Sequence, residues 1–448
     1  MKRTLIFVFV FAIGSLFLSA MSSKPTAETA QKTESAVVFI TGDELGVLQP
    51  CGCTSGQFGG LDRRATVLKS VPESKRMVIG AGAIVEGDSE QDLIKFNIII
   101  HAYGMLNYDL VNLSAKDIEN VTNTGRTDMI GQIFNVISSQ GGDLNMPATF
   151  TKKLSLKGKS ISVTVGTFNS ENQSIEQING LFPCQEPLES VNILFVNNCD
   201  ANTIESIAQA DVHINCLICP ADSEEPGKIV VDSNNPNLPE LIISCGRFGE
   251  YVSRIDITSH PKSNKLKVGF SAIPLTEDLH RDQALVEWYK TYQQLVKDAG
   301  LLEKMPRFPL PNGLEYTGSK SCKICHEYEY AAWSKKVHAN AYATLEKVGS
   351  QYDPECVVCH VVGLEYESGF VSEKQTVHLK NVGCENCHGP GSEHNRSLGE
   401  ALTRDPKSQC VDCHTPDHSG EYAEKEKIYF QKIIHWVEPN TVDNVKSK

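Results

Sequence analysis

Short apolar runs alternate with helix-like stretches through the first 276 residues of the 448-residue chain. Strands of a parallel sheet are covered on both faces, so their sequences are continuously apolar. Residues 91–106 and 201–210 have helical composition and fall between such runs. This alternation predicts an α/β domain over residues 36–276. The runs that we expect to form its strands are 36–41, 76–84, 108–113, 190–196, 211–218 and 241–244.

Two other stretches, 149–167 and 251–275, consist of strand-like halves separated by turn residues, which predicts hairpins at the sheet edges. Residues 277–315 then predict a helical connector, 277–304, and a proline-rich hinge. The remaining segment, 316–448, is rich in Cys and His and is expected to form a separate, mainly α domain.

The N-terminus carries Lys2 and Arg3, and an apolar run, 5–20, follows them. This pattern predicts a signal peptide or N-terminal anchor over residues 1–21, with a polar linker over 22–35. No later run reaches the roughly 18 apolar residues that a spanning helix needs. We therefore expect an exported protein, periplasmic or otherwise extracytoplasmic, that meets a membrane only if its N-terminal segment is uncleaved.

The formal net charge of the chain is −13 at pH 7. Nucleic-acid binding requires clustered Lys and Arg, so this charge argues against a nucleic-acid partner. On electrostatic grounds it favours a basic partner protein.

Eight of the fifteen cysteines belong to one pattern, Cys-x-x-Cys-His, which occurs four times in the last third of the chain. This pattern is the attachment signature of c-type haem. Two thiols at this spacing can each form a thioether to one vinyl group of the ring, while the adjacent His binds the iron. The sequence therefore predicts four covalent haems. The attaching cysteines are Cys322 and Cys325, Cys356 and Cys359, Cys384 and Cys387, and Cys410 and Cys413, and the proximal ligands are His326, His360, His388 and His414.

Only 114 residues separate the first attachment cysteine from His435, inclusive. Fewer than about 30 residues for each haem cannot bury every ring in a side-chain core of its own. We expect the haems to pack on one another and to form much of the core, so this domain should not fold without them.

Each iron has a sixth position, and the segment holds five further histidines, one more than four irons need. A second His closes the iron in a low-spin site suited to electron transfer, whereas an open position lets a small molecule bind and react. His418 is too close to His414 to cross the same ring and would have to serve another haem, and His378 is the weakest candidate. The five candidate distal ligands are His338, His378, His394, His418 and His435.

Three segments resemble the cytochrome c-554 type of tetrahaem protein, which is associated with hydroxylamine oxidation in ammonia oxidisers. They are 316–322 (YTGSKSC), 333–342 (WSKKVHANAY) and 382–394 (VGCENCHGPGSEH). The resemblance implies an electron-transfer module with mostly bis-His haems and room for one open haem. It also implies that His338 and His394 are distal ligands.

The N-terminal half resembles the metallophosphoesterase domain of 5′-nucleotidases through 40–46 (ITGDELG), 59–65 (GGLDRRA) and 242–254 (IISCGRFGEYVSR). A two-metal phosphoesterase needs nitrogen and oxygen ligands that hold both ions and activate water. Of the ligands that the resemblance implies, only Asp43 clearly remains, so we interpret the domain as a catalytically dead relative. The departures at the other ligand positions are Leu45, Ala83, Ala115, Lys116, Leu217 and Cys219.

Seven cysteines lie outside the haem motifs, among them Cys51, Cys53, Cys216 and Cys219. In the resembled fold both of these pairs lie on loops at the carboxyl ends of strands, where open α/β sheets place their sites. We expect the four to come together. A disulfide, a thiolate metal site and isolated buried thiols remain the alternatives.

The favoured hypothesis is an exported tetrahaem c-type cytochrome that transfers electrons between redox partner proteins, with an α/β domain that docks a partner or carries a cysteine site. A multihaem oxidoreductase acting on a small nitrogen compound at an open haem is the first alternative. An active metallophosphoesterase fused to a cytochrome is the second. Whether the protein is an enzyme stays open at this point.

Overall fold

The fold is taken from a computed structural model. It describes residues 34–50, 56–125, 131–139, 146–182, 189–231, 235–260, 263, 265–404, 406–419 and 421–435. The predicted signal or anchor, nearly all of the predicted linker, and Cys51, Cys53 and Cys184 lie outside these residues. The described residues from Ser35 onward belong to one compact unit. In them, no helix combines the length and apolar character needed to cross a membrane.

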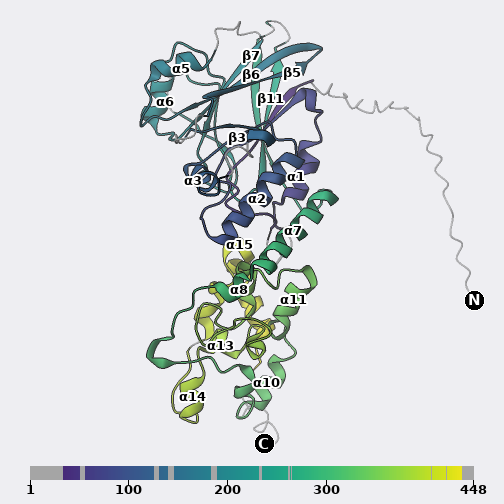
Figure 1. The fold of residues 1–448 in the computed structure, drawn as a ribbon, viewed down its shortest axis with the longest axis vertical. Coiled ribbons are helices and arrows are strands. Elements are labelled where there is room, and N and C mark those ends of the chain that lie inside the picture. Colours follow the sequence, from purple (N-terminus) through teal and green to yellow (C-terminus); the bar gives the residue numbers. More distant parts are fainter. Residues whose placement is uncertain are drawn as a thin grey trace, which may run out of the picture. The chain divides into compact units, whose positions relative to one another are not determined.

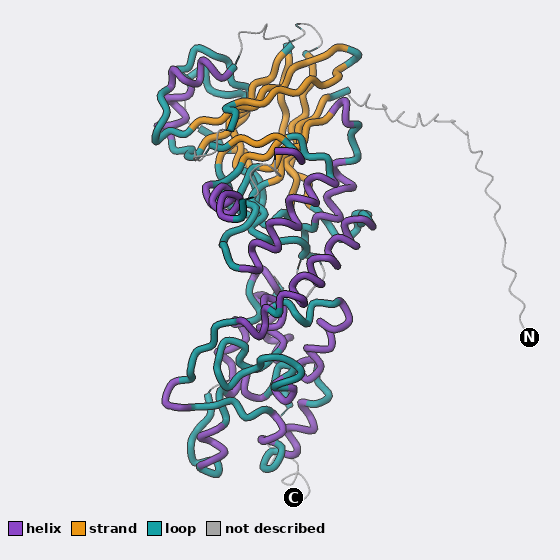
Figure 2. Tube along the Cα trace, in the orientation of Figure 1, coloured by secondary structure: helices purple, strands orange, loops and turns teal. Residues whose placement is uncertain are grey.

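Two six-stranded sheets form the N-terminal part (Figures 1 and 2). The first has the order β12-β11-β1-β2-β3-β4, and its four strands from β1 to β4 are parallel. An antiparallel hairpin, β11 and β12, completes its other edge. The strands are β1 (Ala36–Thr41), β2 (Arg76–Gly80), β3 (Leu110–Asn112), β4 (Asn135–Ile137), β11 (Tyr251–Ser259) and β12 (Leu266–Pro274).

The second sheet has the order β5-β6-β7-β8-β10-β9. Its middle strands are parallel, and the antiparallel pair β5 and β6 closes one edge. The predicted hairpins are thus confirmed at sheet edges. The strands are β5 (Thr149–Leu156), β6 (Lys159–Phe168), β7 (Ser190–Val196), β8 (Cys216–Cys219), β9 (Gly227–Lys228) and β10 (Leu241–Ser244).

Side-chain alternation along β1 explains why its whole length is buried. Val37 and Phe39 point into a core under the helices, whereas Val38 and Ile40 point into a second core between the sheets. Successive strand residues face opposite sides, so a strand covered on both sides must be apolar throughout. The helices of the first layer are α1 (Leu61–Leu68), α2 (Glu90–Met105) and α3 (Ala115–Asn123), and α5 (Ile175–Leu181) and α6 (Ala201–Ile207) belong to the second sheet.

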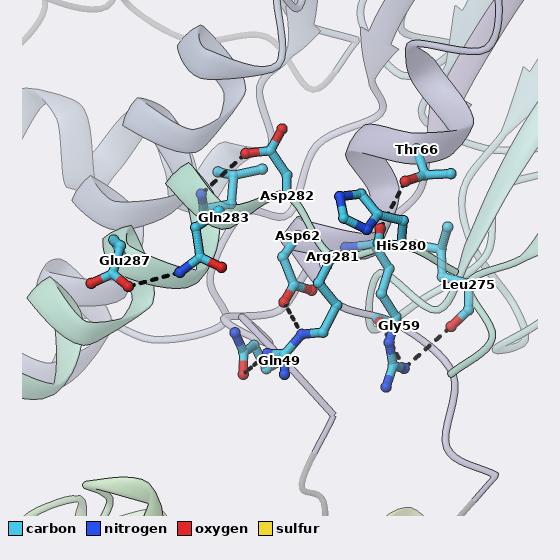
Figure 3. A network of polar contacts seen from close by, with 12 residues as sticks. Gln49, Gly59, Asp62, Thr66, Leu275, His280, Arg281, Asp282, Gln283 and Glu287 are labelled. Carbon is cyan, nitrogen blue, oxygen red and sulfur yellow. Dashed lines mark hydrogen bonds and ion pairs between the residues drawn. The ribbon is translucent and has the colours of Figure 1, made fainter. Parts of the chain in front are cut away.

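The predicted connector forms α7 (Gln283–Ala299) and α8 (Leu301–Lys304), and α7 packs along α1 and α2. Figure 3 shows the polar contacts that hold its start. Arg281 Nε donates to Asp62 on α1 at 2.5 Å, and the Arg281 guanidinium also reaches Gln49 at 3.3 Å. Thr66 Oγ donates to the carbonyl of His280 at 2.7 Å. The first turn of α7 is therefore fixed to α1 of the α/β part.

The remaining described residues form short helices joined by loops. The hydrophobic cluster among them contains nine buried apolar side chains. The predicted order, an α/β sandwich followed by a mainly α part, is confirmed. The helices are α9 (Ser319–Cys322), α10 (Glu327–Trp333), α11 (Ala341–Val348), α12 (Pro354–Val357), α13 (Cys384–His388), α14 (Ser392–Arg396), α15 (Pro416–Ser419) and α16 (Tyr422–Ile433).

Candidate functional site

Short helical segments present the Cys-x-x-Cys-His motifs. In the third motif the entire sequence forms α13, so Cys384, Cys387 and His388 stand at positions i, i+3 and i+4. Residues at these spacings share one face of a helix. A haem ring lying along that face can meet both thiols and the imidazole. The second motif follows the same logic, because α12 passes directly into a 3₁₀ turn over Val358–His360.

Three of the four motif histidines face a second histidine from elsewhere in the chain. Two imidazoles that bind one iron from opposite sides, each through a nitrogen at about 2 Å, place their ring centres roughly 6 Å apart. The observed separations match that distance. They are 6.0 Å for His326 and His394, 6.4 Å for His338 and His414, and 6.3 Å for His388 and His435.

Backbone carbonyls hold several of these imidazoles in the orientation that a metal ligand needs. The Nδ1 atom of His394 lies 2.7 Å from the carbonyl of Ala401, and that of His360 lies 2.6 Å from the carbonyl of Ala341. A proton on Nδ1 that is donated to a carbonyl leaves Nε2 free as the ligand atom. Burial also lowers the pKa of His388 and His360, which favours the neutral form that binds metals. The residues present therefore fit covalent haem with axial histidines.

His360 differs from the other three motif histidines. Among the described residues, no imidazole faces it at the spacing of the three pairs. His418 turns its Nδ1 to the hydroxyl of Thr415 at 2.8 Å. His378 is exposed and packs against Gly318, where an added Cβ would lie 2.9 Å from its ring. His338, His394 and His435 thus each face a motif histidine, and His378 and His418 do not.

Motif cysteines from different motifs contact one another. The Cys322 and Cys384 side chains share a hydrogen bond that lowers the pKa of Cys384 to about 7. Cys359 and Cys413 share a second one, which lowers the pKa of Cys359. α13 also packs against both α9 and the 3₁₀ segment Pro406–Asp412. The four attachment points accordingly follow one another in space in the order first, third, fourth, second.

Sequence reasoning missed Glu385, which lies between the two cysteines of the third motif and is 2% exposed. Its carboxylate accepts hydrogen bonds from the backbone amides of Thr317, Gly318 and Gly391 at 2.9, 2.7 and 2.8 Å. Hydrogen bonds to a buried carboxylate are about twice as strong as neutral ones. Glu385 therefore holds the entry to the first motif beside the third. An acidic residue inside an attachment motif was the available signal.

Comparison with known proteins bears on this region. The family described as "Cytochrome c554 and c-prime" matches residues 321–389. Cytochrome c-554 of Nitrosomonas europaea is 32% identical over 111 residues, which cover 20% of this chain and 47% of that protein. The chain thus spans about half the length of this relative. The cytochrome c554-like region includes the first three attachment motifs and supports covalently bound haem c.

Solved structures with likeness to the α/β part have low identity. A calcineurin-like phosphoesterase, YfkN of Bacillus subtilis, is 13% identical, covers 58% of this chain and 97% of its own, and has a TM-score of 0.42. A 5′-nucleotidase precursor of Thermus thermophilus is 13% identical, covers 70% of this chain and 68% of its own, and has a TM-score of 0.39.

Asp43 follows β1, where the sequence predicts the remnant of a two-metal site. The backbone at Gly42, next to Asp43, packs closely on the backbone at Gly246. A Cβ on Gly42 would lie 1.6 Å from the Gly246 carbonyl oxygen. Burial raises the pKa of Asp43 to about 7, although nearby Arg247 opposes the rise. In the described residues, no three His, Cys, Asp or Glu side chains are grouped so that they could hold a metal ion.

The other positions at which the resemblance to phosphoesterases expects metal ligands have structural surroundings of their own. Lys116 forms ion pairs with Asp88 at 2.9 Å and Glu119 at 3.1 Å on the surface of α3, next to Ala115. Leu217 is buried in the apolar layer under α5 and α6. Leu45 and Ala83 adopt the left-handed backbone, with φ of 50° and 43°.

The prediction that Cys216 and Cys219 join one site is wrong. They are three residues apart on β8, so their side chains leave opposite faces of the sheet. Cys216 is buried between the sheets, where burial raises its pKa far above the usual range, and Cys219 lies in the outer layer. Cys219 forms a disulfide with Cys199, whose Cα atom is 5.6 Å away. Cys51 and Cys53 lie outside the described residues.

Proposed function

We propose that the protein is an exported electron carrier with four covalently bound haems c, which passes electrons between redox partner proteins outside the cytoplasm. The three facing histidine pairs carry this proposal. Haem supplies a one-electron Fe(III)/Fe(II) couple when bound. An iron held by both histidines of a pair would have no position left for another ligand, so it would exchange electrons without binding substrate.

The contacts between motifs support a relay. Sulfur atoms of the first and third motifs touch, as do those of the second and fourth. Rings attached at these cysteines would pack closely, and α13 of the third motif packs against the segments that carry the first and the fourth motifs. The chain's own part in transfer is to hold the four attachment points in fixed order.

The decisive measurement is the intact mass of the mature protein after acid-acetone extraction, together with an electron paramagnetic resonance spectrum. The proposal expects four retained haem additions and three low-spin bis-His signals. Three or fewer additions in fully matured protein would refute the count. Four high-spin signals would refute the electron-carrier assignment.

A haem oxidoreductase is the second candidate, and His360 favours it because no described imidazole faces this residue. An iron with one protein ligand can bind a small molecule in its sixth position. Carbon monoxide added to the reduced protein should then bind one haem per chain. Turnover of hydroxylamine in steady state would make this candidate the primary function.

The α/β part is proposed to be non-catalytic, with a docking role. The substitutions at Leu45, Ala83, Lys116 and Leu217 remove ligands that a two-metal phosphoesterase requires. Export is supported by the sequence of residues 1–21 and by the Cys199–Cys219 disulfide, since such bonds persist in oxidising compartments. A basic partner surface fits the acidic chain.

A further inference from the structure

Asp353, three residues before the second attachment motif, is held by α2 of the α/β part and α7 of the connector. It caps α12, the helix that carries Cys356, by accepting from the Glu355 amide at 3.0 Å. Its side chain also accepts from Gln91 on α2 at 2.9 Å and from the Tyr292 hydroxyl on α7 at 2.8 Å. Asp353 is 7% exposed and Tyr292 only 2%. A buried carboxylate with all its partners in place fixes the helix it caps.

Lys95 on α2 makes a second contact with this segment, an ion pair with Glu355, the residue before Cys356. Its Nζ lies 2.5 and 2.6 Å from the two carboxylate oxygens of Glu355. The lysine side chain is only 9% exposed, whereas that of Glu355 is 58% exposed. The lysine stem passes over Gly46, where an added Cβ would lie 3.1 Å from its Cδ. The loop after β1, where the sequence lacks the expected metal ligands, therefore packs against the Lys95 side chain through Gly46.

The two helices that make these contacts are rigidly placed. α2 begins with a complete capping box at Ser89 and packs along α7. The start of α7 is fixed to α1 by Arg281 and Asp62 (Figure 3). Further along α7, Gln293 donates to the Val348 carbonyl at 2.7 Å and to the Ser350 hydroxyl at 3.1 Å. The residues that lead into the second motif, from Val348 to Glu355, are thus held by α2 and α7.

We propose that the α/β part and α7 hold the attachment segment of the second haem in place. In this proposal Lys95 is a positioning residue that sets the reduction potential of that haem through its ion pair with Glu355. This inference rests on the proposed function, because it requires haem at Cys356, Cys359 and His360. It gives the vestigial domain a role in the electron-transfer chain that needs no metal and no substrate.

The sign of the effect follows from charge. A positive charge near the iron favours the reduced state, which carries one positive charge less, and a negative charge favours the oxidised state. Replacing Lys95 by Met leaves Glu355 unpaired and should lower the potential. Replacing Glu355 by Gln leaves Lys95 unpaired and should raise it. The double variant removes both charges and should return close to the unchanged protein.

The test is a redox titration of the full-length, haem-loaded protein and its variants. It is followed by electron paramagnetic resonance at the high-spin signal assigned to the His360 haem and at the low-spin signals of the others. Lys304→Met serves as the matched control. It also breaks a Lys–Glu pair with α2, Lys304 to Glu90 at 2.8 Å, but both side chains are more than half exposed and neither adjoins an attachment motif.

Opposite shifts of the high-spin haem in Lys95→Met and Glu355→Gln, with little change in the double variant and in Lys304→Met, would support the inference. A contact that only maintains structure predicts shifts of the same sign in both single variants, and that result would overturn it. Unmoved potentials would overturn it too. A protein that retains no haem at Cys356 and Cys359 would instead refute the proposed function, so the two failures are distinguishable.

Discussion

Replacing Arg64 by Met should destabilise the α/β part by about 3–5 kcal/mol, the usual cost of leaving a buried charge without its partner. Arg64 is 1% exposed and forms an ion pair with Glu44, which is fully buried. The guanidinium also donates to the Tyr108 hydroxyl at 3.0 Å, while the Tyr103 hydroxyl donates to Glu44 at 2.9 Å. Without the arginine, the buried Glu44 carboxylate keeps a single tyrosine donor.

Further substitutions in the same cluster should restore part of the lost stability. Arg64→Met combined with Glu44→Met removes both charges but leaves the Tyr103 hydroxyl without an acceptor, which costs about 1–3 kcal/mol. Adding Tyr103→Phe removes that unpaired hydroxyl, and the Tyr108 hydroxyl still donates to Thr41 at 3.1 Å, so the triple variant should regain most of the lost stability. Lys69→Met, which breaks the Lys69–Asp282 pair where the lysine side chain is 55% exposed, should change stability by less than about 1 kcal/mol.

Urea unfolding measures these values when the β-sheet signal is followed by far-ultraviolet circular dichroism. The haem region contributes helical signal, so the strand wavelength and a shared baseline are needed. A loss below about 1 kcal/mol for Arg64→Met would mean that water reaches Glu44, contrary to the burial argument. A triple variant no more stable than the single one would show that the cluster acts through something other than its charges.

His394→Ala should convert one low-spin haem into a high-spin haem that binds carbon monoxide, whereas His418→Ala should leave the spectrum unchanged; identical spectra would remove His394 from the ligands. Burial raises the pKa of Asp43 to about 7, so the stability that the unchanged protein has over Asp43→Asn should grow as pH falls from about 7 to 4. The upper limit is about 4 kcal/mol, at about 1.4 kcal/mol for each pKa unit above 3.8, and a pH-independent difference would contradict it. Cys199→Ser should cost about 3 kcal/mol in unfolding free energy, with Cys219→Ser equivalent and the double variant no worse than either. Phosphate-ester hydrolysis with added Mn²⁺ or Zn²⁺ should stay at background, and metal-dependent turnover would reverse the non-catalytic assignment.

Much of the α/β part could be predicted because its strands are buried on both sides and therefore visible as apolar runs. β1, β7 and β10 begin and end as predicted. The predicted strand from residue 76 ends early, at Gly80, because Gly82 and Ala83 turn the chain with positive φ. The order of strands in two sheets could not be predicted, since pairing depends on side chains that are distant in sequence.

In the haem region, too, some features could be predicted from the sequence and others could not. Each attachment motif is a local pattern in the sequence, whereas the two histidines of each of the three facing pairs lie 47 to 76 residues apart. Spare histidines alone could not show which pairs form, and only the family resemblance selected His338 and His394. The error at Cys216 and Cys219 was avoidable, because a separation of three residues in a strand always places side chains on opposite faces.

The three histidine pairs interlock along the chain. The spans 326–394, 338–414 and 388–435 each begin before the preceding one has closed. If the chain is exported from its N-terminus and carries haem as proposed, none of the three pairs can be completed until His394 has emerged, and the third pair waits for His435. Maturation would then be vectorial: haem could attach early, but the pairs would become possible only as His394, His414 and His435 emerged, in that order. A chain stopped before residue 394 would carry haems yet have none of these pairs completed.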